Sequence, residues 1–427
     1  MSTVRRFLPV RMQRVALTAR DEDLAAVLEV VGAAGTVELE PVAGGDRGAD
    51  PLTAMLTGAT HRDCCAALPG WCPADARAPL AARIAPFGGA LVPLPAPPGV
   101  DPPTLLAPAG AAHRAFAPLV RTYGTVPYTD LDPTLPAGIA YVLMFGMMFA
   151  DTGHGLLLAA AALVLRGCGR HRLRRLHPLW PLLLAAGLVS AAFGALFGEC
   201  FGPTGVVPAL WLEPMADPVR LLVAGVVLGG VLLGAAYTAG VVNRWREGGA
   251  AAALYAPSGL AGAGVLAAAA AVAAGLYAGR VPIVAAGAGL ALAGLGLAAA
   301  GLRAAAGRGG AAVAQIAVQL FDLVIRVGAN VVSFARLAAF GLTHAALGAV
   351  VWAGATAAWR LGGGWPVAGV ALFVAGNAVT FGLEALVAGV QALRLEYYEL
   401  FSRVFESTGR PFRPWRLTPA GKEEVHA

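Results

Sequence analysis

Residues 312–356, AVAQIAVQLFDLVIRVGANVVSFARLAAFGLTHAALGAVVWAGAT, decide the class of this protein. The stretch is almost wholly apolar and has no proline, which favours one continuous helix. At 1.5 Å per residue such a helix is about 60 Å long, roughly twice the thickness of a bilayer's hydrocarbon core. Residues 364–406 form a second stretch of this kind. We therefore expect two long membrane helices that tilt steeply or project, and a large partner lying alongside would supply the packing reason for a steep tilt.

The composition of the whole chain also indicates a membrane protein. Of its 427 residues, 58% are hydrophobic and 13% are charged, which is too apolar for a soluble protein of this size. The predicted fold class is mainly α: a polytopic membrane helical bundle of about eight spans with two long tilted C-terminal helices, preceded by a small α/β cytoplasmic domain. Six apolar segments, the first two of them short, supply the remaining spans: 135–150, 153–166, 179–200, 217–243, 251–277 and 281–303.

The N-terminal part carries ordinary turn and charge chemistry. Apolar and polar residues alternate at Arg14–Thr18 and Thr36–Leu39, and apolar residues between Leu24 and Val31 have helical spacing. This pattern predicts a β-α-β arrangement. A second unit is expected over residues 51–93, followed by a proline-rich linker and a short amphipathic helix around Ala111–Tyr123.

We divide the chain into residues 1–134, a cytoplasmic α/β domain and linker, and residues 135–427, a transmembrane domain. The N-terminus is basic but lacks the apolar run of a signal peptide, so the first part should stay in the cytoplasm. Arginines gather in alternate loops, such as 166–175, which agrees with the positive-inside rule if both termini are cytoplasmic. The composition, rich in Arg, Ala and Gly, suggests a bacterial genome, and hence a bacterial inner (plasma) membrane.

Arg336 and Arg394 lie deep in the two long apolar stretches. A charged side chain at such a depth costs at least about 2.5–3.5 kcal/mol, so it normally faces a polar cavity or a counter-charge. Because a guanidinium stays charged at any accessible pH, it can supply a fixed positive field but cannot carry a proton. The alternative is permanent pairing with an internal acid such as Glu384 or Asp322. Two arginines at similar depth favour a functional role.

Polar side chains accompany Arg336 along its helix. Asp322 lies fourteen positions before it and His344 eight after it, which places all three on roughly one helical side. With the orientation above, Asp322 is nearer the cytoplasm and His344 nearer the outside. Asn330 and Ser333 lie between them. For His344, Asn330 and Ser333 the alternative is hydrogen bonding between helices.

Acidic side chains accompany Arg394 in the same way. Glu384 lies ten positions before it, toward the outside, whereas Glu396 and Glu399 lie inward. Protonatable groups thus occupy two depths with an arginine between them. This indicates two half-paths for protons rather than one open pore.

Asp151, His154 and Glu199 are polar residues near the ends of shorter spans. Asp151 and His154 lie at the break between the first two spans, and we expect them to pair and cap the turn rather than bind a metal. Glu199 is a carboxylate at the membrane edge that could anchor its loop. The five cysteines show no paired CxxC spacing, so we expect neither a disulfide framework nor a metal site, and no cofactor. The sequence has no GxxxxGK[ST] loop, so the chain should not hydrolyse ATP by itself.

Five stretches of the sequence resemble one known family. They look like the membrane half of the a subunit of V-type and archaeal-type ATPases, called subunit I in bacteria. The opening residues 9–39, PVRMQRVALTARDEDLAAVLEVVGAAGTVEL, are similar to that family's first α/β lobe. The five stretches are TYGTVPYTDLDPT (122–134), YVLMFGMMFADTGHGLLL (141–158), FGALFGECFG (193–202), ANVVSFARLAAFGLTHAALG (329–348) and GLEALVAGVQALRLEYYELFSRVFESTGRPFRPW (382–415).

The resemblance implies a static subunit whose two long helices lie against a rotating ring of proteolipid (c, K or L) subunits. It implies that Arg336 is the essential arginine facing the ring carboxylate and that Arg394 is its companion. Glu384 and His344 would line the outer half-channel, and Asp322 the cytoplasmic one. The implied partners are the ring, the peripheral and central stalk subunits and membrane lipid, with no nucleic acid.

The sequence departs from this family in two respects. Members usually have a long coiled-coil arm in the cytoplasmic half, and 134 residues with no heptad run cannot build it. Glu396 stands where the family commonly has histidine.

Two other functions remain possible interpretations of the sequence. One is a stand-alone secondary transporter, for which internal repeats would be expected, and the other is a degenerate homologue kept for assembly or regulation. The sequence does not distinguish H⁺ from Na⁺, or pumping from ATP synthesis.

Overall fold

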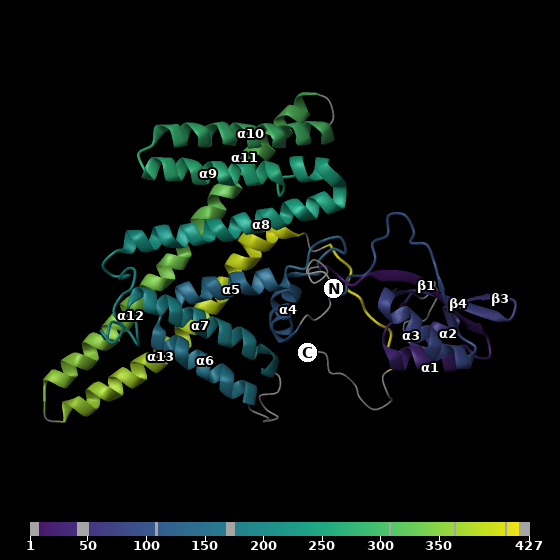
Figure 1. Cartoon of the computed structure of the whole chain (residues 1–427), viewed down its shortest axis with the longest axis horizontal. Coiled ribbons are helices and arrows are strands. Elements are labelled where there is room, and N and C mark those ends of the chain that lie inside the picture. The colour runs from purple at the N-terminus through teal and green to yellow at the C-terminus, as the bar shows by residue number, and fades with distance from the viewer. Residues whose placement is uncertain are drawn as a thin grey trace. The chain divides into compact units, whose positions relative to one another are not determined.

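The computed structural model describes residues 8–40, 51–106, 110–167, 176–306, 309–362, 364–405 and 408–417. Their contacts divide them into two compact units (Figure 1). The α/β unit consists of the described residues of Met1–Ala107, Gly124–Asp132 and Ser407–Ala427, and the helical unit of those of Pro108–Tyr123 and Pro133–Glu406. These units differ from the predicted division at residue 134 in two places. The amphipathic helix that starts near residue 111 belongs to the helical unit, and the last described segment of the chain belongs to the α/β unit.

The α/β unit is built on an antiparallel sheet with strand order β2-β4-β1-β5, and β3 also pairs with β4. The predicted β-α-β start is confirmed. Val15, Leu17 and Ala19 alternate inward along β1, and Gly35 ends α1 with a φ of 56°, a conformation that glycine adopts without strain. The elements are β1 (Met12–Arg20), α1 (Leu24–Ala34), β2 (Glu38–Leu39), α2 (Pro51–Thr57), β3 (Thr60–Arg62), β4 (Cys65–Pro73), α3 (Ala74–Ile84) and β5 (Ala90–Pro93).

The segment 408–417, which we call the C-terminal strap, completes the α/β unit. It forms a parallel bridge in which the Thr104 N–H donates to the Arg410 carbonyl oxygen (2.7 Å) and the Phe412 N–H donates to the Thr104 carbonyl oxygen (3.1 Å). Further along, the Trp415 N–H donates to the Val37 carbonyl oxygen (2.8 Å), and the Trp415 ring packs against the core of the unit. The last described segment of the chain is therefore part of the same fold as the first described strand, β1.

The helical unit contains the apolar helices. Six helical segments are long and apolar enough to cross a membrane, and α5 and α6 are shorter apolar helices, so the prediction of about eight spans with the first two short agrees with the structure. The chain is a mainly α, multi-pass membrane protein. The elements are α4 (Ala111–Tyr123), α5 (Thr134–Met148), α6 (Thr152–Gly167), α7 (Trp180–Phe197), α8 (Pro218–Tyr255), α9 (Leu260–Tyr277), α10 (Val281–Ala305), α11 (Gly310–Ser333), α12 (Ala335–Arg360), α13 (Trp365–Leu395), the π-helical turn η5 (Glu396–Phe401) and α14 (Ser402–Val404).

The two long C-terminal spans are present as predicted. Helices α11 and α12 follow each other across Phe334 to form one apolar run of 51 residues, and α13 continues through η5 and α14 to form a run of 40 residues. Figure 1 shows α12 and α13 lying side by side along a diagonal of the helical unit, joined at Arg360–Trp365. Neither span is a plain α-helix from end to end, because one has a break and the other a π-helical turn.

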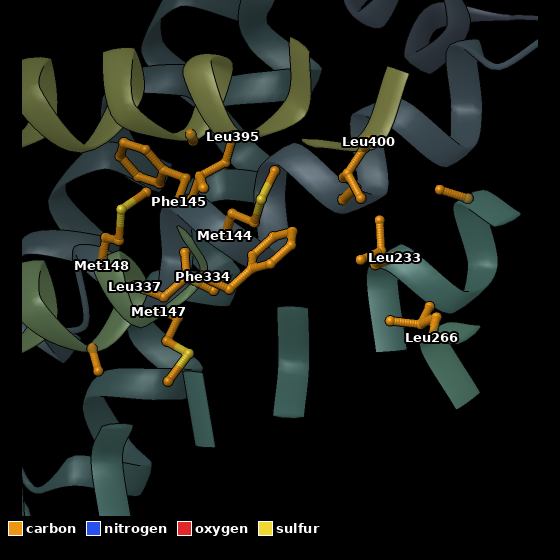
Figure 2. Packing of buried hydrophobic residues seen from close by; sticks show 14 of the residues in the cluster. Met144, Phe145, Met147, Met148, Leu233, Leu266, Phe334, Leu337, Leu395 and Leu400 are labelled. Atoms are coloured by element: carbon orange, nitrogen blue, oxygen red, sulfur yellow. The ribbon is translucent and has the colours of Figure 1, made fainter. Parts of the chain in front are cut away.

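The core of the helical unit is where α5 meets these two spans. Figure 2 shows Met144 of α5 together with Phe334, from the break between α11 and α12, and Leu395, from the end of α13. All three side chains are fully buried. The core thus fixes the two irregular points of the long spans against one short helix.

Helices α6 and α7 approach each other through small residues. A methyl group placed on Gly187 would lie 2.6 Å from the Gly155 carbonyl oxygen and 2.6 Å from the Ala159 N atom. Contacts this close are possible only for glycine, and they are the usual way in which membrane helices gain packing energy. This pairing holds the start of α6, and with it residues 151–154, in place.

Candidate functional site

A break in the helical backbone precedes Arg336. The chain passes from α11 to α12 at Phe334, whose N–H donates to the Val331 carbonyl oxygen (3.2 Å) in a turn tighter than an α-helix. Phe334 is fully buried, and any side chain at Gly229 of α8 would overlap its ring. The packing of Phe334 therefore fixes the direction in which α12 starts, and Arg336 is in the first turn of that helix.

Arg336 is linked to Glu399 through the hydroxyl of Ser333. The Arg336 Nη2 donates to Ser333 Oγ (2.9 Å), and the Ser333 hydroxyl donates to the Glu399 carboxylate. Glu399 lies in η5, and the wider π-helical turn sets its direction relative to α13. Arg336 Nη1 is buried and has no hydrogen-bond partner among the described residues. The guanidinium thus keeps part of its donor capacity unused.

Glu399 also lies under the influence of the second arginine. The positive charges of Arg336 and Arg394 both act on its carboxylate. Two arginines on adjacent helices would repel each other, and a carboxylate between them reduces that repulsion. The structure therefore brings together Arg336, Ser333, Glu399 and Arg394, four of the residues selected from the sequence.

Asn330 and Arg403 form a neighbouring contact between the two long spans. With its amide turned so that both ends are satisfied, Asn330 donates to the Arg326 carbonyl oxygen (3.1 Å) and accepts from Arg403 Nη2 (3.1 Å). Arg403 is buried and its guanidinium lies 5.7 Å from the centre of the Tyr237 ring. The sequence analysis did not select Arg403, because its partners are far away in the sequence.

Asp322 is apart from the Arg336 group. It forms an ion pair with Arg326, one turn further along α11, and both side chains are about half exposed. A separation of fourteen residues along a helix corresponds to about 21 Å. This pair gives Arg326, a charge that the sequence left unexplained, a direct partner.

His344 and Glu384 form a second polar cluster together with Asp151 and His154. His344 Nδ1 contacts the Glu384 carboxylate, and His344 Nε2 lies 3.8 Å from Asp151 Oδ2. The His154 Nδ1 lies 3.9 Å from Asp151 Oδ1. The sequence-selected residues of α12, α13 and the α5–α6 break therefore meet at one point, separate from the Arg336 group.

Asp151 is held by three backbone N–H groups. The His154 N–H donates to Oδ1 (2.8 Å), which caps the start of α6, and the Phe201 and Gly202 N–H groups donate to Oδ1 and Oδ2 (3.0 Å each). Phe201 has a φ of 54°, rare for a residue other than glycine, and Gly202 has a φ of 88°. This strained turn points consecutive N–H groups at one carboxylate.

Glu199 belongs to the same loop. It is buried, its carbonyl oxygen accepts from the Thr152 N–H (2.9 Å), and its Oε2 has no hydrogen-bond partner among the described residues. Glu199 therefore fixes the loop to the start of α6 through its backbone and leaves a free carboxylate oxygen next to the cluster. Nothing in the local sequence revealed that Phe201 and Gly202 would bind Asp151.

Glu396 is a fully buried acid that lies outside these clusters. Its side chain is fully buried in η5, and neither carboxylate oxygen has a hydrogen-bond partner among the described residues. A buried carboxylate without partners is costly when ionised. The residue that departs from the expected family pattern is thus a buried carboxyl group without a hydrogen-bond partner among the described residues.

Comparison with known proteins identifies relatives. The model of the V-type ATPase 116 kDa subunit family matches residues 88–201. The A-type ATP synthase subunit I of Thermococcus kodakarensis is 27% identical over 322 residues, covering 71% of this chain and 46% of that protein. The protein of the same name from Aeropyrum pernix is 28% identical over 370 residues, covering 76% of this chain and 52% of its own.

A eukaryotic protein also matches. The human V-type proton ATPase 116 kDa subunit a 3 is 32% identical over 120 residues, covering 26% of this chain and 14% of that protein. The chain spans about half the length of the archaeal relatives that it matches. The matched family model, the repeated subunit I relatives and the helical membrane fold agree with one another, and together they support placing the chain with the V/A-type ATPase subunit I family, also described as the V-type ATPase 116 kDa subunit family.

Proposed function

We propose that this chain is the static, ion-translocating membrane subunit of a rotary V/A-type ATPase. The observation that carries the proposal is the Arg336–Ser333–Glu399 link at the irregular points of the two long spans. The relatives support it, because they are named as subunits of A-type ATP synthases and of a V-type proton ATPase. The chain itself does not catalyse ATP hydrolysis, and the reaction that it serves takes place on other subunits.

Arg336 is the charge that each carboxylate of a rotating ring must pass. A fixed guanidinium with an unused buried donor, Nη1, can hold such a carboxylate in its ionised form. The ring carboxylate then loses its proton to one half-path and regains a proton from the other half-path after nearly a full turn. Because arginine does not release its own proton, it also prevents direct leakage between the two paths.

The two polar clusters support the assignment of two half-paths. His344 and Glu384, with Asp151, His154 and Glu199, line the outer half-path. Of these residues, His344 lies on α12 itself, about 12 Å along the helix from Arg336, which is the rise expected for eight residues. The buried apolar residues Leu337, Ala338 and Gly341 lie between the two positions in the sequence of α12. An apolar layer of this kind keeps water from joining the two paths.

The inner half-path begins at Glu399, and Asp322 marks its cytoplasmic end, supported by Ser333 and Asn330. Arg394 assists by reducing the cost of a charge at Glu399. Protons approaching from the cytoplasm would therefore meet acidic groups before reaching the arginine.

The partners follow from this role. A proteolipid ring lies against the long spans, and peripheral and central stalk subunits complete the assembly. The membrane is a bacterial inner (plasma) membrane, with residues 1–134 and both termini on the cytoplasmic side. The α/β unit is the part that can reach the stalk subunits.

The decisive experiment replaces Arg336 by glutamine in the assembled complex. We expect the ring and the nucleotide-binding subunits to purify with the variant, whereas ATP-driven proton uptake into vesicles falls to background. Arg360→Gln is the matched control, because Arg360 is an exposed arginine at the far end of the same helix, α12. An Arg336→Gln complex that transports protons at the wild-type rate would refute the proposal.

A further inference from the structure

Two buried histidines face one aspartate at distances that are too long for hydrogen bonds. His344 Nε2 lies 3.8 Å from Asp151 Oδ2, and His154 Nδ1 lies 3.9 Å from Asp151 Oδ1. Hydrogen bonds between nitrogen and oxygen normally span about 2.7–3.2 Å. The two imidazole rings are 5.6 Å apart and nearly perpendicular to each other. The three side chains thus surround a common point without bonding directly across it.

The three side chains are almost completely shielded from solvent. Their exposed fractions are 0% for Asp151, 2% for His154 and 3% for His344. Neither ring nitrogen of His154 makes a hydrogen bond of normal geometry among the described residues. A buried polar atom without a partner destabilises the fold. An imidazole that is retained in such a position has a free lone pair directed at its neighbours.

The spacing of these atoms suits a shared metal ion. Zinc binds imidazole nitrogen at about 2.0–2.1 Å and carboxylate oxygen at about 2.0–2.2 Å, so two ligands of one ion lie about 3.4 Å apart in tetrahedral geometry and at most about 4.2 Å apart. The 3.8 Å between His344 Nε2 and Asp151 Oδ2 falls within this range, and His154 Nδ1 lies 3.9 Å from the other oxygen, Oδ1, of the same carboxylate. One ligand atom from each of the three residues can be chosen so that all lie within 4.8 Å of one another. A small rotation of the His154 side chain would bring its ring nitrogen close enough to share one ion with His344 and Asp151.

The residues around the cluster orient its side chains by direct contacts, as the neighbours of metal ligands do. Glu384 contacts Nδ1 of His344 and thereby directs Nε2 toward Asp151, an arrangement found at many metal-binding histidines. The Asp151 carboxylate accepts three backbone N–H groups, two on Oδ1 and one on Oδ2. A carboxylate has about four acceptor positions, so Oδ2 keeps one for a metal. Capping of α6 by Asp151 and metal binding are therefore compatible.

We propose that Asp151, His154 and His344 form a binding site for Zn²⁺ or a similar divalent transition-metal ion, and that its occupation blocks the outer half-path. The blocking rests on the function proposed above. His344 cannot bind a metal through Nε2 and pass a proton along the same side, and a bound cation repels protons entering the path. External zinc would therefore inhibit ion transport by this subunit.

Metal binding is tested directly, without any transport assay. The chain is purified in detergent without a histidine tag, and Zn²⁺ binding is measured by calorimetry, with Co²⁺ absorption as a readout of four-coordinate nitrogen and oxygen ligands. We expect one ion per chain, and at least tenfold weaker binding for His154→Asn and for His344→Asn. His177→Asn, which removes an exposed histidine of the same unit, is the control and should bind as the wild type does. Unchanged binding in both cluster variants, or no binding to the wild type, would overturn the proposal.

Two further measurements distinguish loss of the metal site from loss of the fold. Gel filtration and a thermal melt of each variant in detergent show whether it is folded, and Asp151→Asn, which keeps acceptor capacity toward the backbone but loses the charge, provides a third substitution at the site. If all three folded variants bind Zn²⁺ as the wild type does, the site is elsewhere and the proposal fails.

The blocking step is tested in vesicles that contain the assembled complex. The measured quantity is the ratio of ATP-driven proton uptake with and without micromolar Zn²⁺, for the wild type and for His154→Asn. We expect at least a tenfold higher inhibitory concentration in the variant. One-to-one binding without inhibition would leave the metal site standing and overturn the blocking. Conversely, zinc binding together with wild-type transport by Arg336→Gln would overturn the proposed function and leave the metal site standing.

Discussion

Arg336 and Glu399, on two different long spans, are joined through a single hydroxyl group. The guanidinium donates to Ser333 Oγ, and the Ser333 hydroxyl donates to the Glu399 carboxylate. This link connects the first turn of α12 to the π-helical turn after α13. It fixes the distance between the fixed charge and the carboxylate that faces it.

Replacing Ser333 by alanine should weaken transport by removing this link. A hydrogen bond to a charged group contributes about 1.5–3 kcal/mol, so we expect roughly a tenfold or greater loss of ATP-driven proton uptake. Ser333→Thr keeps the hydroxyl and should retain most of the activity. Transport by Ser333→Ala at the level of Ser333→Thr would show that the link has no part in the ion path.

Replacing Glu384 by glutamine should affect the other cluster. The neutral amide keeps the shape of the side chain but removes the charge that holds His344 Nδ1. We expect proton uptake to fall at least tenfold while the ring still purifies with the subunit, since a charge-assisted bond is replaced by a weaker neutral one. Glu213→Gln, at an exposed loop position, is the control. If Glu384→Gln and Glu213→Gln took up protons at equal rates, Glu384 would have no part in the ion path.

Much of this fold could be predicted because local patterns determine it. The long apolar runs without internal proline predicted α11–α12 and α13, and the alternation at Arg14–Thr18 predicted β1. The sequence placed His344 and Glu384 toward the same side of the membrane, and the family resemblance implied that both line the outer half-channel. These features depend on periodicity and on the bilayer's thickness, which a sequence displays directly.

Other features depend on contacts between distant residues and left no local signal. The N–H groups of Phe201 and Gly202 bind Asp151 only because the loop folds back over α6. The π-helical turn at Glu396–Phe401 follows from packing at the end of α13, since a π-helix has no simple sequence signature. Asp322 pairs with Arg326, four residues away, although the sequence also allowed a role beside Arg336.

The close packing of α6 on α7 predicts a strong effect of small substitutions at Gly187. A valine there would overlap the Gly155 carbonyl oxygen and separate the two helices. We expect a loss of stability of about 1–3 kcal/mol, the usual cost of overpacking, seen as a lower temperature of aggregation in detergent. Gly234→Val on α8 is the control, because a methyl group at that position would have no neighbour within 4 Å among the described residues outside its own helix turn. Similar melting of both variants would contradict the tight packing of this pair.

The C-terminal strap predicts that a substitution near the end of the chain destabilises its beginning. Trp415 packs against the core of the α/β unit, and its N–H donates to the Val37 carbonyl oxygen. Removing the half-buried ring should cost about 1–3 kcal/mol of apolar burial. In the full chain, Trp415→Ala should therefore speed hydrogen exchange at amides of α1 and β1 by about ten- to a hundredfold and leave exchange in α12 unchanged.

Arg413→Ala is the matched control for this prediction. Its exposed side chain is removed, but its backbone N–H still donates to Glu38 Oε2 (2.8 Å), so protection of α1 should persist. If amides of α1 exchanged as slowly in Trp415→Ala as in Arg413→Ala, the C-terminal strap would not stabilise the α/β unit. Faster exchange confined to the α/β unit would mean that the C-terminal strap stabilises this unit, which is proposed to meet the stalk. Damage to the strap would then weaken the attachment to the stalk and leave the ion path unchanged.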